Sequence, residues 1–212
     1  MILSYFQTHA TEYWHMVLQH LGLSGAALLL AICIAIPTGV LCTRFRRLER
    51  VSVGFWSVLR IVPSLAVLFL LVPFVGTGTR SAVIALVLLA IPPILINTIL
   101  AFQTLPRDVL EAGTGMGMST RRLFWTIKVP LAFPVVFAGI RTATIEVIAS
   151  ATLASYIGAG GLGDLIFTGM GLMRQDLLWI GGGSVAFLSL LTGGLLTLID
   201  KRARRYERMD QS

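Results

Sequence analysis

The sequence predicts an all-α integral membrane protein whose chain crosses the bilayer five times. Of its 212 residues, 56% are hydrophobic and only 13% are charged, against roughly 25% charged in a soluble domain. The mean hydropathy is +0.84, and the apolar residues gather in runs of about 20, which is the length that a helix needs to cross a bilayer. A soluble globular enzyme is therefore nearly excluded, and a disordered chain or a disulfide scaffold is excluded with it.

Three of the five predicted spans carry no charge and need no special surroundings. These are residues 22–42, 81–102 and 177–199. The other two, 51–75 and 131–155, contain Arg60 in the first and Arg141 and Glu146 in the second. Because an ion deep in a bilayer needs a partner or a polar cavity, we expect these positions to face the bundle interior. The whole chain, 1–212, is expected to be one domain.

The basic residues lie in the connections and predict the orientation, since Lys and Arg are enriched in cytoplasmic loops. Four arginines fall within 43–50, four basic residues within 103–130 and five in the tail after residue 200, whereas the other side carries only Arg80 and Arg174. We therefore expect the N-terminus outside and the C-terminus in the cytoplasm. The net charge of +7 belongs to this pattern, so a nucleic-acid partner is not expected. The aromatic opening segment is expected to be an interfacial helix.

The long cytoplasmic connection, residues 104–130, is expected to be structured. Pro106 can open a helix, and Asp108 and Glu111 suit the positive N-terminal end of its dipole. The glycines that follow, at positions 113, 115 and 117, permit a sharp turn.

A second short helix is predicted after this turn. Ser119 is a reasonable N-cap for a helix that starts at Thr120 and ends before Pro130. Residues 107–125 would then protrude from one face as a docking element, although an ordinary connection is the alternative.

At these residues the sequence resembles the permease subunits of bacterial ABC importers. Their cytoplasmic signature is Glu-Ala-Ala, three residues, Gly, nine residues, and then Ile-x-Leu-Pro. The matching positions here are Glu111, Ala112, Gly113, Gly117, Ile127, Val129 and Pro130. Two of them differ in type, with Gly113 in place of Ala and Val129 in place of Leu.

Two further stretches resemble the osmoprotectant branch of these importers, whose substrates are quaternary amines such as glycine betaine, carnitine and choline. They are residues 60–66 and residues 138–144 running on to 157–163. Glu146 departs from the apolar or neutral residue expected at its position. The candidates for the solute path or its gate are Arg60, Pro63, Ser64, Arg141, Thr142, Glu146, Gly158, Gly160, Gly161 and Gly163.

The resemblance also implies the partners of the chain. They are a cytoplasmic ATPase dimer docked on 107–125, a second permease of the same or another sequence, a solute-binding protein outside the membrane, and membrane lipid. ATP and Mg²⁺ would bind to the ATPase, and this chain would bind no cofactor and catalyse no reaction. The alternatives are an amino-acid importer of the methionine type and, from another class, a membrane channel or enzyme.

Motifs for other chemistry are weak. Residues 158–163 match G-x-G-x-x-G, but this pattern indicates a dinucleotide site only between a strand and a helix. We interpret residues 156–164 instead as part of the outer mouth, with a flexible surface loop as the alternative. No phosphate-binding G-x-x-x-x-G-K-[ST] motif occurs, and the three histidines, at positions 9, 15 and 20, are interpreted as interfacial polar residues.

The fourth span carries an unusual polar stripe, formed by Thr142, Glu146 and Ser150 at intervals of four residues. Arg141 lies about 140° around the helix from Glu146, so the two cannot comfortably pair. Arg60 is the expected partner of Glu146. The pair would be either structural or part of the solute path. Pro63 is expected to break the second span, and the Pro92–Pro93 pair the third.

Overall fold

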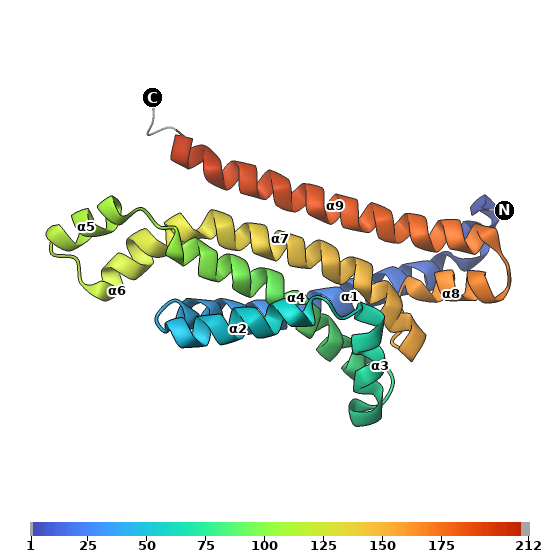
Figure 1. Cartoon of the computed structure of the whole chain (residues 1–212). Helices are drawn as coiled ribbons and strands as arrows, with labels where there is room; N and C mark the ends of the chain where they lie inside the picture. Colours follow the sequence, from blue (N-terminus) through green and yellow to red (C-terminus); the bar gives the residue numbers. More distant parts are fainter. Residues whose placement is uncertain (1, 209–212) are drawn as a thin grey trace.

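The computed structural model describes residues 2–208, and this part of the chain is a bundle of helices with short connections (Figure 1). The α-helices are α1 (Ile2–Cys42), α2 (Arg46–Leu59), α3 (Ser64–Val75), α4 (Thr79–Gln103), α5 (Arg107–Gly115), α6 (Thr120–Leu123), α7 (Val129–Ala154), α8 (Gly163–Gly171) and α9 (Gln175–Arg208). A π-helical turn, Phe124–Lys128, joins α6 to α7, and a 3₁₀ turn, Ser155–Ile157, follows α7.

The long helices run between two distinct ends of the molecule. Figure 1 shows α5 and α6 at one end, and the start of α1 together with α8 at the other. Four helices are long and apolar enough to cross a membrane, and the bent pair α2 and α3 gives a fifth candidate span. The all-helical class predicted by the sequence is therefore confirmed, with four to five candidate membrane spans.

Helix α4 is the centre of the bundle, packed between α1 and α7. A stripe of alanines on α1, at positions 27, 31 and 35, is fully buried with Leu86, Ala90 and Ile94 of α4 and Ala143 and Val147 of α7. Small residues at intervals of four let helix backbones approach closely, which is how helices associate where lipid offers no hydrophobic driving force. The same packing sets the position of the polar residues of α7 relative to α1 and α4.

The second predicted span is broken more sharply than its hydropathy suggests. Helices α2 and α3 meet at 99°, with Pro63 in an extended conformation at the start of α3. Proline cannot donate a backbone hydrogen bond and disfavours helix in the residue before it. Because α3 has 12 residues, it is about 18 Å long and cannot cross a bilayer alone.

The expected break at Pro92–Pro93 was wrong. Helix α4 continues through both prolines, which are fully buried between neighbouring helices. Surrounding helices support a proline-containing helix because they hold it in place and occupy the freed backbone groups. Pro63 lacks such an enclosure, since it is exposed at the corner between α2 and α3.

One expected helix end was also wrong. The helix that starts at Thr120 does not end before Pro130 but passes through the π-helical turn into α7. The wider turn relieves the clash between a proline ring and the carbonyl group four residues earlier. The opening segment is kinked at His9, and from residue 10 onward it continues without a break into the first span.

Candidate functional site

A cavity of about 400 Å³ lies where the broken span α2 and α3 faces α4 and α7. It is lined by Leu59, Arg60, Ile61, Val62, Pro63, Ser64, Leu88, Leu89, Pro92, Glu146, Ala149 and Ser150. Four of the residues that the sequence singled out for a solute path, Arg60, Pro63, Ser64 and Glu146, therefore line one cavity. Residues from three separate segments meet there because the bend at Pro63 turns the α2–α3 corner toward α7.

An ion pair crosses this cavity. The Nη2 atom of Arg60 donates to Oε1 of Glu146 at 3.2 Å, so the pairing that the sequence suggested is present. The two side chains are 47% and 39% exposed in this chain, so the pair is partly buried and faces the cavity. Both side chains therefore reach into the cavity, where a solute could contact them.

Helix α4 contributes one wall of the same cavity. Pro92 and Pro93 have no N–H, so the carbonyl groups of Leu88 and Leu89 lose the donor that lies four residues further on. Leu88, Leu89 and Pro92 all line the cavity.

The other polar residues of α7 are separated from this cavity. Arg141 points toward α9, where its Nη1 atom donates to Oγ1 of Thr197 at 3.2 Å. Thr142 is exposed, and its hydroxyl donates to the carbonyl oxygen of Ala138 at 3.0 Å. The polar stripe on α7 is thus real, but of its members only Glu146 and Ser150 line the cavity.

The glycine-rich segment after α7 forms a structured turn that is held by α1. Gly158, Gly160 and Gly161 have φ values of +78°, +75° and +96°, which side chains other than glycine rarely adopt. The side chain of Gln19 forms two hydrogen bonds with the turn. Its Nε2 donates to the carbonyl oxygen of Ala159 at 3.2 Å, and its Oε1 accepts from the amide of Gly161 at 3.1 Å.

Gly163 fits closely at the start of α8. A Cβ at this position would collide with the carbonyl oxygen of Thr152 and the side chain of Ser155. The segment is therefore built into the end of the bundle rather than loosely attached to it.

His20 is the clearest residue that the sequence misplaced. It is fully buried, and its Nε2 lies 3.0 Å from the carbonyl oxygen of Ile148, to which it donates. It is therefore not an interfacial residue. One signal in the sequence places it inward, because His20 and Ser24 continue at intervals of three or four residues the buried alanine stripe of α1 that starts at Ala27. For Gln19 no such signal exists.

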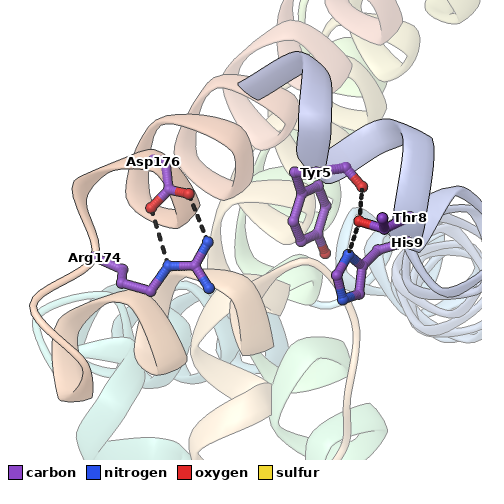
Figure 2. A network of polar contacts seen from close by, with 5 residues as sticks. All are labelled: Tyr5, Thr8, His9, Arg174 and Asp176. Atoms are coloured by element: carbon purple, nitrogen blue, oxygen red, sulfur yellow. Dashed lines mark hydrogen bonds and ion pairs between the residues drawn. The ribbon is translucent and has the colours of Figure 1, made fainter. Parts of the chain in front are cut away.

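A second polar group lies at the same end of the molecule, between the start of α1 and the connection from α8 to α9 (Figure 2). Arg174 donates to Asp176 through two hydrogen bonds of 3.2 and 2.6 Å. Across from them, the Tyr5 ring stacks on His9, and the Thr8 hydroxyl contacts both residues. A cavity of about 590 Å³ lies between these two groups.

One acidic group near the glycine turn has an altered acidity. Burial raises the pKa of Asp164, at the start of α8, and a hydrogen bond with Ser155 opposes the rise in pKa. The carboxyl group therefore resists ionisation more than an exposed aspartate would.

At the opposite end, α5 and α6 form the bent element that the sequence predicted. Glu111 and Ala112 are exposed on α5, while Gly113 is buried against the next helix. A Cβ on Gly113 would lie 2.6 Å from Cδ1 of Leu123 and 3.0 Å from Cδ1 of Ile127. The signature residues at positions 113 and 127 therefore meet in one packing contact.

The turn between the two helices uses the last glycine of the signature. Gly117 has φ +77° and open space around it, so a left-handed conformation rather than crowding requires glycine there. Ser119 then caps α6 as expected, since its Oγ accepts from the amide of Arg122 at 3.4 Å. Pro130 lies in the first turn of α7, just after the π-helical turn.

Comparison with known proteins agrees with this architecture. The chain is 42% identical over 201 residues to the carnitine transport permease protein OpuCB of Listeria monocytogenes, covering 95% of this chain and 92% of that protein. It is 35% identical over 201 residues to the glycine betaine/carnitine/choline transport system permease protein OpuCB of Bacillus subtilis, with 95% and 93% covered.

A solved structure shares the fold. A chain of the MetNI methionine ABC transporter, in an inward-facing conformation, matches with a TM-score of 0.80 and 20% identity, over 90% of this chain and 95% of that one. The family described as the binding-protein-dependent transport system inner membrane component matches residues 31–205. The chain belongs to this family of transport permeases.

Proposed function

We propose that the chain is the permease subunit of an ATP-driven importer for quaternary-amine osmoprotectants, of the kind represented by carnitine, glycine betaine and choline. The observation that carries the proposal is the cavity that holds the Arg60–Glu146 pair, in a chain whose relatives are named for the transport of these compounds. The cavity would be part of the solute path, with Pro63 and Ser64 at its rim.

The chemistry of the cavity suits a solute that carries both charges. Carnitine and glycine betaine are zwitterions, so the carboxylate of the solute would replace Glu146 on Arg60 while its ammonium group moved next to Glu146. Each protein charge then keeps a partner, which limits the desolvation cost of opening the pair.

The bent element α5–α6 is proposed as the docking surface for a separate cytoplasmic ATPase. Its exposed face carries Glu111 and Ala112, and the packing of Gly113 on Leu123 makes it a firm extension of α7. ATP and Mg²⁺ would bind to that ATPase. Closure of two ATPases would move two such elements together and shift the helices between inward-facing and outward-facing states, as a rigid-body change.

The remaining partners follow from the exposed surfaces. Helix α3 projects from the bundle with a largely exposed apolar face that includes Phe74, which is 86% exposed, and a second permease would cover it. A solute-binding protein would dock at the end that carries α8 and the glycines at positions 158, 160, 161 and 163. That end would lie outside the membrane, and the end with α5 and α6 in the cytoplasm.

The proposal can be tested with the complete transporter, reconstituted in vesicles with its ATPase and binding protein. We expect uptake of labelled carnitine or glycine betaine that requires ATP and stops when Glu111 is replaced by Arg. Methionine is the control solute for the amino-acid alternative. Uptake of methionine but of no quaternary amine would contradict the proposed substrate, and ATP-independent flux of either solute would contradict an ABC permease.

A further inference from the structure

A cavity separate from the one with the Arg60–Glu146 pair lies at the α5–α6 end. It has a volume of about 600 Å³ and is lined by Val40, Thr43, Arg44, Phe102, Gln103, Thr120, Arg121, Phe124 and Lys128. These residues come from the end of α1, the end of α4 and the α6–α7 junction. The cavity is therefore placed where three membrane helices terminate together.

This cavity is strongly cationic. Three basic side chains line it, Arg44, Arg121 and Lys128, and no acidic residue does. Among the side chains that the structure describes, no carboxylate lies within 4.0 Å of their nitrogen atoms. Thr120 and Gln103 add neutral hydrogen-bond donors. Three unpaired cations around one cavity suit an anion with several acceptor oxygens. A phosphate group is a common anion with this property.

The walls of the cavity are partly apolar, and this property helps to decide whether the phosphate belongs to a lipid or is a free ion. The rings of Phe102 and Phe124 stack with their centroids 5.7 Å apart and line the cavity together. Trp125 follows Phe124 and is 63% exposed, in the manner of aromatic residues at a membrane–water interface. A cationic rim above an apolar wall at interface level fits a lipid better than a free phosphate ion.

We propose that this cavity binds a phosphate group and that an anionic phospholipid carries it. The headgroup would contact Arg44, Arg121 and Lys128, and the start of its acyl chains would lie against Phe102 and Phe124. Bound there, the lipid would connect α1 and α4 to the base of α6, at the junction through which the docking element joins the membrane helices.

The test compares lipid retention by the complete transporter. The assembled complex is purified with an equal mixture of phosphatidylglycerol and phosphatidylcholine of the same acyl chains, and retained lipids are counted by native mass spectrometry. One variant replaces Arg44, Arg121 and Lys128 with Gln. The matched control replaces Arg46, Arg47 and Arg50, three exposed arginines of α2 that do not line the cavity.

We expect the wild type and the α2 control to retain phosphatidylglycerol preferentially, and the cavity variant to lose this preference. The loss should approach about fivefold for each cation removed, which is the ratio given by roughly 1 kcal/mol per basic residue near an anionic membrane surface. Equal losses in both variants would reduce the effect to general electrostatic attraction and overturn the proposal, as would an unchanged preference in the cavity variant.

A second arm separates the two sources of phosphate. Glycerol 3-phosphate or inorganic phosphate is added at millimolar concentration during the lipid exchange. A lipid held by its chains as well as its headgroup should not be displaced. Displacement of the retained lipid in the wild type but not in the cavity variant would assign the cavity to a free phosphate compound and overturn the lipid as its ligand. Because neither arm measures solute uptake, the result does not depend on which solute the permease carries.

Discussion

At the scale of single residues, the Arg60–Glu146 pair matters both for the stability of charges in the membrane and for the proposed solute path. Each ion alone at this depth would cost about 3 kcal/mol on insertion scales, and the contact at 3.2 Å gives each a partner. Both side chains stay partly exposed to a cavity. Each charge therefore has a partner, and both side chains can still contact a solute. Mutations of the two residues should therefore change selectivity before they change folding.

The first prediction concerns solute selectivity. In Arg60→Gln, Glu146 keeps its charge without a partner, so the cavity should favour a net cation over a zwitterion. We expect the uptake ratio of choline to glycine betaine to rise severalfold in the reconstituted complex, and to fall in Glu146→Gln. The same binding protein is used throughout, so its own preference cancels between variants.

Arg50→Gln is the matched control, because Arg50 is an exposed arginine on α2 that does not line the cavity. Its uptake ratio should equal that of the wild type. If both cavity variants keep the wild-type ratio while the complex still transports quaternary amines, the solute does not contact the pair. The pair is then structural, although the proposed function stands.

The second prediction concerns Asp164. Since burial raises its pKa above the ordinary value of 3.8, its protonated form favours the folded state. That stabilisation is complete below pH 3.8 and is lost as the pH rises through the folded pKa. Asp164→Asn should therefore unfold at a higher temperature than the wild type at pH 7, and the difference should vanish near pH 4. A wild type that is more stable than the variant at pH 7 would contradict this assignment.

At the scale of elements, prolines and glycines act through their surroundings. Pro63 ends a helix at an exposed corner, whereas Pro92 and Pro93 lie inside a helix that its neighbours enclose. Gly113 and Gly117 of the α5–α6 element also differ, because the first permits close packing and the second a left-handed turn. The residue type is a local signal, but its effect depends on what packs against it.

The third prediction uses this difference within α5. Gly113→Val places methyl groups against Leu123 and Ile127, and overpacking of this kind costs typically about 1–3 kcal/mol. We expect the docking element to shift, so that ATP hydrolysis continues while uptake per ATP falls. Gly115→Ala is the control, because nothing lies within 4 Å of a Cβ there and alanine favours the helix. Equal coupling in the two variants would mean that the contact does not transmit motion.

The fourth prediction concerns the exposed face of α5. Glu111→Arg reverses a charge that has no hydrogen-bond or ion-pair partner among the described side chains, so the permease should insert normally. The ATPase should bind more weakly, and uptake should fall at least tenfold. Pull-down of the ATPase with the purified permease measures the first effect. A variant that binds the ATPase as the wild type does would place the docking surface elsewhere.

At the scale of the whole molecule, the two ends of the bundle differ. Helices pack closely at the α8 end, whereas α5 and α6 protrude at the other (Figure 1). The α8 end is tied together by contacts between residues far apart in the chain, such as Gln19 with Gly161, whereas α5 and α6 project beyond the other helices (Figure 1). Arg44 after α1, and Arg121 and Lys128 before α7, lie on the α5–α6 side. This distribution supports the proposed orientation.

The fifth prediction tests that orientation. In a background without Cys33 and Cys42, single cysteines at Arg47 and Thr79 are labelled in intact cells with a membrane-impermeant thiol reagent. Both positions are exposed, so access depends on the side of the membrane. We expect Thr79→Cys to react and Arg47→Cys to react only after the cells are opened. Labelling of Arg47→Cys in intact cells would reverse the topology.

The sequence by itself determined the fold class and much of the α5–α6 element. Hydropathy over about 20 residues fixes which segments can enter a membrane, and this property does not depend on distant parts of the chain. The turn at Gly117 and the cap at Ser119 are also local, since their hydrogen bonds and backbone angles involve neighbouring residues. The pairing of Glu146 with Arg60 could be inferred because few charges were available inside the spans.

Only the tertiary structure decided which polar residues share a cavity. Arg141 and Glu146 are near each other in sequence, yet one faces α9 and the other Arg60. The contact of Gln19 with Gly161 likewise has no signal in the sequence, whereas the burial of His20 was missed although His20 continues the alanine stripe of α1. The physical reason is that in a membrane every face of an apolar helix can meet lipid or protein, so hydropathy does not reveal the partner. Close packing of small residues on α1, α4 and α7 determines which helix faces meet.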